Sequence, residues 1–255
     1  MKLGYMMIPG PAVGQDWNCN RGRAELARDL GFSEFYSADQ DGHPFGVDGA
    51  PEHADHLNVL TDLPVRPMPK VIAIEGKRQR ISDSAAAGHI VRPSVTAQQV
   101  VSHAREQKAS LSVSWLNKTE LAKHWAAHVT GSTHAGLIAR PEDWRVARTI
   151  LVCEDAARAE AAVKSDDSPC RDYYRRMAKP GATSADIDGL IESSVLYGPL
   201  QSVLDQLMDI SSASGPFGTL ALVDHAWQDD VLAQQSLASL VSAIAPVLRQ
   251  DRAIN

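Results

Sequence analysis

Short apolar runs alternate with helix-like patterns along this chain, and few architectures are compatible with such an alternation. Lys2 to Ile8 is an apolar run followed by Pro9-Gly10-Pro11, as a buried strand is followed by a loop. A helical pattern comes next and is expected to end at Gly31, and Glu34 to Ala38 then forms a second strand-like run. A strand, a helix and a strand in this order make the βαβ unit of a parallel sheet, so the sequence predicts an α/β fold.

The same alternation continues downstream. Further strands are predicted at residues 89–92, 110–115, 145–153 and 218–223. Helices are predicted at residues 51–63, 96–107, 118–129, 155–163, 202–210 and 231–248. A hairpin is predicted within residues 70–82, where two short β-like runs flank Gly76-Lys77. No repeat or low-complexity tract divides this series, so we expect one domain over residues 1–255.

Composition and charge restrict the possible functions. The 255 residues, 44% of them hydrophobic, can bury one sizeable core. The formal net charge of -6 is spread along the chain rather than gathered into a basic stripe, so neither nucleic-acid nor membrane binding is indicated. Three cysteines without CxxC spacing indicate reduced thiols, and no apolar run approaches the ~20 residues of a membrane span. Because the sequence opens on a strand pattern without a signal-peptide layout, we expect a cytoplasmic protein that acts on a small molecule.

Several stretches of the sequence, taken in order, resemble a known family. They are Met6-Met7-Ile8-Pro9, His124-Trp125, Asp143 to Arg148, Leu196-Tyr197-Gly198-Pro199 and Gly215 to Leu220. On these residues the chain resembles the luciferase-like flavin-dependent monooxygenases, of the bacterial luciferase, limonene and diketocamphane monooxygenase type. The resemblance implies a TIM-barrel-like parallel (βα) barrel that holds reduced FMN at the carboxyl ends of its strands.

The resemblance also implies a reaction and a partner. In such families reduced FMN, usually supplied by a separate flavin reductase, reacts with dioxygen, and a small organic substrate is oxidised. Two hypotheses of another class stay open, namely a non-catalytic protein that binds flavin or a flavin adduct, and a degenerate structural subunit of a luciferase-like complex. The sequence has no GxGxxG after its first strand, no Walker loop and no GxSxG, so no motif indicates a different chemistry.

The chain departs from the family directly after its second predicted strand. Only Gln40 to Pro44 lie between that strand and Phe45, where the family has two more βα units. A βαβ unit needs roughly 30 or more residues, so we expect a shortened or incomplete barrel with about two βα units missing. The loss would expose strand edges, which a loop, a smaller closed barrel or a neighbouring subunit must cover. We therefore expect a homodimer, or a heterodimer with a homologue.

Candidate catalytic residues lie at two strand ends. The family commonly places a histidine after the acidic residue that ends the second strand, whereas here Asp39 is followed by Gln40. An amide cannot carry a proton as an imidazole does, which leaves His43 as the nearest histidine, or as an ordinary loop residue. His225 is the third catalytic candidate, because it follows Asp224 at the end of the last predicted strand.

Candidate cofactor-binding residues lie at other strand ends, besides the Asp39 carboxylate. Arg92, Ser94 and Thr96 lie in a turn between a strand and a helix, where a guanidinium, hydroxyls and amides can bind a phosphate. In the family the matching turn contacts the FMN phosphate; the alternative is that Ser94 or Thr96 only caps the helix. Ser114 ends another predicted strand, where a barrel places its ligand.

Two histidines have a spacing that also occurs in metal sites. His124 and His128 stand one helical turn apart. No glutamate lies between them in an HExxH order and no third ligand is evident, so we expect no metal site.

Overall fold

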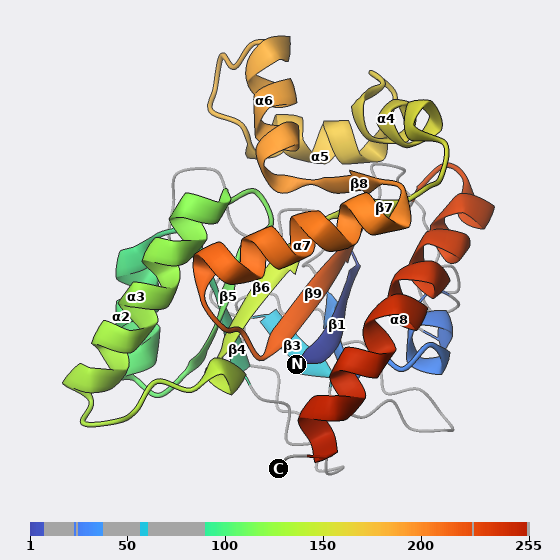
Figure 1. Cartoon of the computed structure of the whole chain (residues 1–255). Helices are drawn as coiled ribbons and strands as arrows, with labels where there is room; N and C mark the ends of the chain where they lie inside the picture. Colours follow the sequence, from blue (N-terminus) through green and yellow to red (C-terminus); the bar gives the residue numbers. More distant parts are fainter. Residues whose placement is uncertain (8–22, 24, 38–56, 61–89, 226, 254–255) are drawn as a thin grey trace, which may run out of the picture.

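The computed structural model describes residues 1–7, 23, 25–37, 57–60, 90–225 and 227–253 (Figure 1). The described strands are β1 Lys2–Met7, β2 Glu34–Ser37, β3 Leu57–Leu60, β4 Ile90–Ser94, β5 Ala109–Ser112, β6 Trp144–Arg148, β7 Ile150–Val152, β8 Leu196–Gly198 and β9 Thr219–Asp224. The described helices are α2 Ala97–Arg105, α3 Lys118–His134, the 3-10 helix Pro141–Asp143, α4 Ala156–Lys164, α5 Pro169–Met177, α6 Ser184–Ser194, α7 Leu200–Ser214 and α8 Asp230–Ala253. Residues 23 and 25–29 are also helical.

Seven of the described strands form a closed barrel in the order β1-β2-β3-β4-β5-β6-β9. Neighbouring strands are parallel except at β3, which is antiparallel to both β2 and β4. The pairing of β1 with β9 runs over six residues, from Lys2 opposite Thr219 to Met7 opposite Asp224. The predicted α/β class and the shortened, mainly parallel barrel are therefore confirmed.

β3 lies in the gap between β2 and β4. It pairs with β2 on one side and with β4 on the other, so those two strands do not pair directly. The predicted helix over residues 51–63 is wrong at Leu57–Leu60, because strand partners on both sides favour the extended conformation over the local periodicity. The predicted hairpin within residues 70–82 lies outside the described residues.

β6 leaves the barrel at its carboxyl end and continues, after the single residue Thr149, as β7. β7 pairs in parallel with β8 in a separate two-stranded sheet. Figure 1 shows this sheet above the carboxyl ends of the barrel strands, with α4, α5 and α6 above the sheet. We call β7, β8 and these three helices the roof. The sequence pattern predicts one strand over residues 145–153, whereas the structure divides it at Thr149.

An ion pair between β2 and β6 identifies the side chains that point into the barrel. Glu34 of β2 accepts hydrogen bonds of 2.9 and 3.2 Å from Arg145 of β6, although these strands are not neighbours. The contact therefore crosses the interior, where Tyr36 also donates to Glu34. Gly4 faces the same space, since a Cβ atom there would lie 2.6 Å from the Tyr36 ring. Because side chains alternate along a strand, Tyr5 faces the outside.

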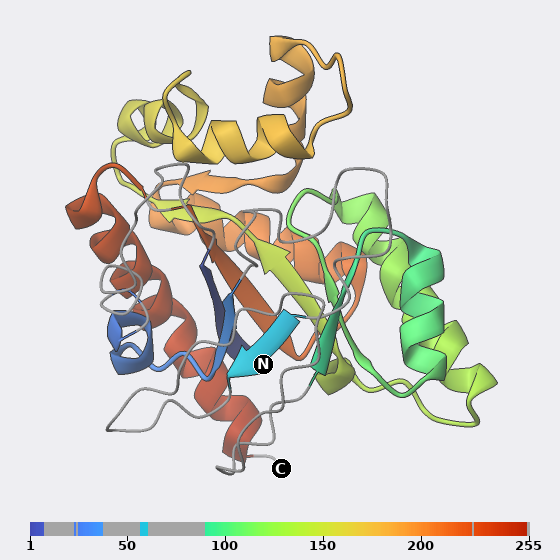
Figure 2. The same ribbon diagram turned by 180° about the vertical axis from the view of Figure 1, so that it is seen from behind.

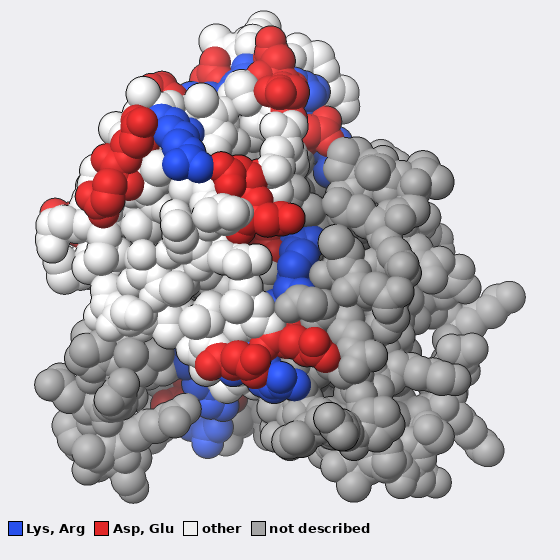
Figure 3. Space-filling model, turned by 90° about the vertical axis from the view of Figure 1, so that its right-hand side faces the viewer, with Lys and Arg blue, Asp and Glu red and all other residues white. Residues whose placement is uncertain are grey.

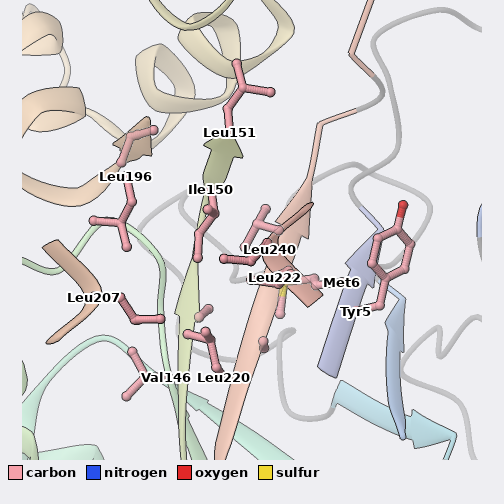
Figure 4. Packing of buried hydrophobic residues seen from close by; sticks show 14 of the residues in the cluster. Tyr5, Met6, Val146, Ile150, Leu151, Leu196, Leu207, Leu220, Leu222 and Leu240 are labelled. Carbon is pink, nitrogen blue, oxygen red and sulfur yellow. The ribbon is translucent and has the colours of Figure 1, made fainter. Parts of the chain in front are cut away.

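The outer face of the barrel is covered by helices. Figure 2 shows α2 and α3 side by side on one flank and α8 on the other. On β9, Leu220 and Leu222 belong to the same buried cluster as Leu207 of α7 and Leu240 of α8 (Figure 4). Burial of each such side chain contributes about 1.5–3 kcal/mol of transfer free energy.

The helix predictions for residues 96–107, 118–129, 155–163, 202–210 and 231–248 are confirmed as α2, α3, α4, α7 and α8. Helices α5 and α6 were not predicted. Gly31 ends the first helical segment as expected, with a positive φ of 96° and a hydrogen bond to the Arg28 carbonyl. None of the described helices is long and apolar enough to cross a membrane.

Candidate functional site

The carboxyl ends of β5, β6 and β9 meet in a buried network of polar side chains beneath the roof. Thr149, between β6 and β7, has its Oγ1 atom 2.7 Å from Nε2 of His225 and 3.2 Å from the Tyr174 hydroxyl. Ser114, just after β5, has its Oγ atom 2.9 Å from the Tyr173 hydroxyl. Both tyrosines belong to α5, so this helix joins three strand ends through hydrogen bonds.

His225 is neutral in this network. Burial, together with the positive charges of Arg23 and Arg176, lowers the pKa of its imidazole to about 3. Its Nδ1 atom is buried and has no hydrogen-bond partner in the described structure. The ring packs against Tyr173, with centroids 4.8 Å apart, and against Trp227 at 5.5 Å. A neutral imidazole with one unused nitrogen can exchange a hydrogen bond with a neighbouring group.

Arg148, at the end of β6, is a fully buried cation. It donates hydrogen bonds to the backbone carbonyls of Ser114 at 3.2 Å, Ala147 at 2.8 Å and Leu116 at 2.8 Å. Burial lowers the pKa of its guanidinium to about 10, so the group remains charged at neutral pH. Arg148 thereby fixes the segment after β5, including the predicted ligand residue Ser114.

These contacts determine which part of the barrel mouth is filled by protein. The side chains of Tyr173, Tyr174 and Arg148 are fully buried, and His225 is 2% exposed. The mouth is therefore filled by side chains beside β5, β6 and β9.

The predicted phosphate-binding turn lies at the end of β4, on the side that faces α2. The Ser94 hydroxyl lies 3.0 Å from Nδ1 of His103 on α2. Because side chains alternate along β4, the half-buried Arg92 points to the same side. Burial lowers the pKa of His103, and the positive charge of Arg92 lowers it further. The positive charge of Arg92 thus makes this turn favourable for an anion.

Thr96 caps α2, which was the alternative to phosphate binding for this residue. Its side chain accepts a hydrogen bond from the Gln99 amide at 3.3 Å. The Gln99 side chain in turn accepts from the amides of Val95 at 2.8 Å and Thr96 at 3.0 Å. These amides are therefore already bonded within the helix, and a phosphate would be held by Arg92 and Ser94 or would displace Gln99.

The structure groups some predicted residues and separates others. Ser114 and His225 both contact Tyr173 and so belong to one cluster. Arg92, Ser94 and Thr96 form a second group at the β4 end. Asp39, Gln40 and His43 lie outside the described residues, and their roles stay predictions.

A third cluster, on the outer face of β1 and β9, was not predicted. Asp224 accepts hydrogen bonds from the Tyr5 hydroxyl and from Nε of Arg23, the latter at 2.7 Å. Tyr5 is in register with Leu222, two residues before Asp224, so their nearness follows from the β1–β9 pairing. Asp224 does not cap α8; Asp229 does so, because its Oδ1 accepts from the Leu232 amide at 2.9 Å.

The two histidines with metal-like spacing contact protein groups instead. Nδ1 of His124 lies 2.8 Å from the Ser112 hydroxyl, and Nε2 of His128 lies 3.2 Å from the Arg140 carbonyl. Burial lowers the pKa of His124 to about 4, against a smaller opposing effect of a hydrogen bond with the Val95 backbone. Within the described part of the chain, no three His, Cys, Asp or Glu side chains are placed to hold a metal ion.

Comparison with known proteins identifies the fold. No protein-family model and no curated protein sequence matches this chain. Flavoprotein 390 superposes with a TM-score of 0.62 and 13% identity, covering 98% of this chain and 97% of that chain. An F420-dependent secondary alcohol dehydrogenase in complex with an F420-acetone adduct superposes with a TM-score of 0.58 and 10% identity, covering 95% of this chain and 98% of that chain.

A further match is partial. The monooxygenase RslO1 from Streptomyces bottropensis superposes with a TM-score of 0.50 and 18% identity over 63% of this chain and 48% of that chain. This chain therefore spans about half the length of the monooxygenases that it matches in this way. Together these structures show that the chain has the fold of the luciferase-like monooxygenases, which the sequence motifs predict.

Proposed function

We propose that this chain, which has the luciferase-like fold, is a flavin-dependent oxidoreductase of the monooxygenase type that uses reduced FMN on a small organic substrate. The main support is the near end-to-end match with flavoprotein 390 and with an F420-dependent secondary alcohol dehydrogenase, whose names identify a flavoprotein and an F420-dependent enzyme. Parallel strands that end at one face also provide the usual position for a barrel ligand.

The residues at the β4 end fit the phosphate of FMN. Arg92 supplies a guanidinium and Ser94 a hydroxyl on the same side of β4, beside His103. Charge-assisted hydrogen bonds from arginine to phosphate are among the stronger ones in proteins. We propose that Arg92 and Ser94 hold the phosphate, and that a bound phosphate raises the lowered pKa of His103.

The described part of the mouth would exclude water from the reaction. When bound, reduced flavin supplies the electrons for the reaction with dioxygen. Tyr173 and Tyr174 fill the mouth beside β5, β6 and β9, so solvent cannot enter between these strand ends. Neutral His225 can donate or accept one hydrogen bond at Nδ1 without changing its charge.

A second candidate function is flavin binding without turnover. It is favoured by the complete burial of His225, the one predicted catalytic residue that the structure describes. A group that transfers a proton to substrate must come within hydrogen-bond distance of it, and α5 covers His225 on the mouth side. In this case the chain would hold a flavin or flavin adduct, and the Tyr173–His225 cluster would be purely structural.

The proposed function also implies a partner protein, a compartment and a dimer. A separate flavin reductase would supply reduced FMN, and the chain would act in the cytoplasm as a homodimer or as a heterodimer with a homologue. The closed barrel has no unpaired edge among its described strands, so a dimer would be held by helix faces rather than by strand pairing.

The proposal is tested with the purified protein, FMN and a flavin reductase. Substrate oxidation faster than that by free reduced FMN, over a panel of aldehydes and ketones, would support the oxidoreductase. Stoichiometric FMN binding without such an acceleration would support the binder. Absence of FMN binding, together with co-purification of a longer homologue, would contradict both and support a structural subunit.

The phosphate site is tested with a matched pair of arginine variants, one on β4 and one on α2. Arg92→Gln removes the proposed phosphate ligand, and we expect FMN to bind about ten-fold more weakly. Arg105→Gln removes an exposed charge on α2 and should leave FMN affinity unchanged. Riboflavin, which lacks the phosphate, should bind both variants as it binds the original chain. Equal FMN affinity in all three proteins would place the phosphate elsewhere.

A further inference from the structure

A cavity of about 300 Å³ lies between β1 and β9 on one side and α8 on the other. Figure 3 views the flank that carries α8, where acidic and basic side chains lie next to one another on the surface. The volume is at the lower end of the ~300–1,000 Å³ typical of small-molecule sites. The polar residues described in its wall are Tyr5, Arg23, Asp224, Asp230, Gln234 and Ser236.

This cavity is separate from the barrel interior. Tyr5 and Leu222, which line it, are in register on β1 and β9 and point to the outside of the barrel. The Glu34–Arg145 pair lies on the opposite face of the same sheet. A molecule in this cavity would therefore be separated by strands β1 and β9 from a flavin held at the barrel mouth.

One part of the wall is fixed before any ligand binds. Asp224 receives hydrogen bonds from Tyr5 and Arg23, and its side chain is 12% exposed. The charges of Asp224 and Arg23 compensate each other. This ion pair therefore forms a polar but electrically balanced end of the cavity.

Asp230 gives the wall its net charge. It is the first residue of α8, and its side chain makes no hydrogen bond or ion pair with the described residues. With Arg23 and Asp224 paired, Asp230 leaves one uncompensated negative charge among the described residues of the wall. Gln234, one helical turn later, adds an amide that can accept a hydrogen bond.

The rest of the wall is apolar. Leu222 of β9, Leu237 and Leu240 of α8, and Ile150 of β7 supply aliphatic surface. Trp227 adds an aromatic side chain near the start of α8. Aromatic faces attract organic cations, and aliphatic walls accept a compact apolar body.

We propose that this cavity binds a small primary amine with a compact apolar body. The ammonium group would lie at Asp230 and Gln234, near Trp227, and the body would lie among the leucines. A carboxylate ligand of the same size is disfavoured, because Asp230 would repel it and the Arg23 guanidinium is already paired with Asp224.

The test uses three ligands of equal size and different charge with the full chain. Phenethylamine, 2-phenylethanol and phenylacetate are titrated by calorimetry at neutral pH. We expect phenethylamine to bind with a Kd of about 1 mM or tighter, the alcohol to bind about ten-fold more weakly, and phenylacetate not to bind. Equal affinity of the three ligands, or no amine binding, would overturn the proposal.

Two variants locate the bound amine. Asp230→Asn should weaken phenethylamine about ten-fold and leave 2-phenylethanol unchanged. Ala233→Phe fills the cavity from α8 and should abolish binding of both ligands. Gln235→Phe adds the same side chain at an exposed position on α8 outside the wall, and should bind the amine normally.

Amine binding in this cavity does not depend on the proposed flavin site. Amine affinity should be the same with and without saturating FMN, because strands separate the two positions. Competition between the amine and FMN would show that the amine binds at the mouth and would overturn the second site. Binding that survives Ala233→Phe would overturn it as well.

Discussion

Glu34 and Arg145 carry opposite charges across the barrel interior, where they have little contact with solvent. Their side chains are 2% and 7% exposed and lie 2.9 Å apart. Removing one member of such a pair leaves the other as a buried charge without compensation. We expect Glu34→Gln to lower the free energy of unfolding by roughly 3–5 kcal/mol at pH 7, as measured by urea denaturation.

The effect of Glu34→Gln should depend on pH in a definite direction. Burial raises the pKa of Glu34, but the guanidinium of Arg145 and hydrogen bonds from Arg145 and Tyr36 lower it more, so the net pKa is below its ordinary value. The ion pair therefore stabilises the fold above the unfolded pKa, and this stability is lost as the pH falls through the folded pKa. The two proteins should become alike in acid. Glu142→Gln, at an exposed glutamate, should change stability by less than about 0.5 kcal/mol.

His225 gives a second prediction, with a pH window set by its pKa of about 3. In the unfolded chain the imidazole has a pKa near 6.5 and binds a proton below that pH, whereas in the folded protein it stays neutral. Stability should therefore fall as the pH drops below about 6.5, by up to ~1.4 kcal/mol per unit from this residue.

His225→Phe should flatten this slope between about pH 6 and pH 4, although it also removes the hydrogen bond to Thr149. His134→Gln, at an exposed histidine of α3, serves as the control and should keep the slope of the original chain. An unchanged slope in His225→Phe would mean that His225 is not the residue that stays neutral.

At the residue scale, the sequence indicates which residues lie at strand ends better than it indicates which side chains they contact. Asp224 and His225 stand out because they follow an apolar strand, and the structure places both at the end of β9. Tyr173 and Tyr174 were missed because their segment is polar on the whole, although its few apolar residues share one face of α5. Their contacts with Ser114 and Thr149 join residues 59 and 25 positions apart, which local patterns do not encode.

At the scale of elements, the α2–α3 contact depends on one glycine. A Cβ atom at Gly131 would lie 2.5 Å from the Val101 carbonyl oxygen, which belongs to the backbone and cannot rotate away. We expect Gly131→Ala to destabilise the protein by about 1–3 kcal/mol through forced separation of the helices, measured by thermal unfolding.

Gly189 of α6 provides the matched control. No atom lies within 4 Å of a Cβ added there, so Gly189→Ala should stabilise the protein by up to about 1 kcal/mol through helix propensity. Equal effects of both substitutions would contradict a close contact at Gly131.

Most helices were predictable because their ends are marked by residues with a local mechanism. Asp155 caps α4 through the Arg158 amide, and Thr96 caps α2, both within three residues. β3 was mistaken for a helix because nothing in Leu57–Leu60 specifies partners from β2 and β4. Local sequence signals therefore predict the helices, whereas they do not predict which distant strands pair with each other.

For the whole molecule, closure of the barrel depends on β3. The Val59 backbone pairs opposite Tyr36 of β2. Val59→Pro would disturb this ladder and expose the facing edges of β2 and β4. We expect a protein that associates to larger species at micromolar concentration, as measured by size-exclusion chromatography with light scattering. A variant with the mass distribution of the original chain would show that β3 is not needed to cover these edges.

The pairing of β1 with β9 has a consequence for synthesis on the ribosome. These strands match over six residues, yet about 210 residues of chain separate them. At ~5–20 residues per second, β1 must wait roughly 10–40 s for its neighbour to be translated. During that interval the apolar surface of β1 is accessible to chaperones. Translation of β9, rather than of β1, therefore determines when the nascent chain can bury this surface and avoid aggregation.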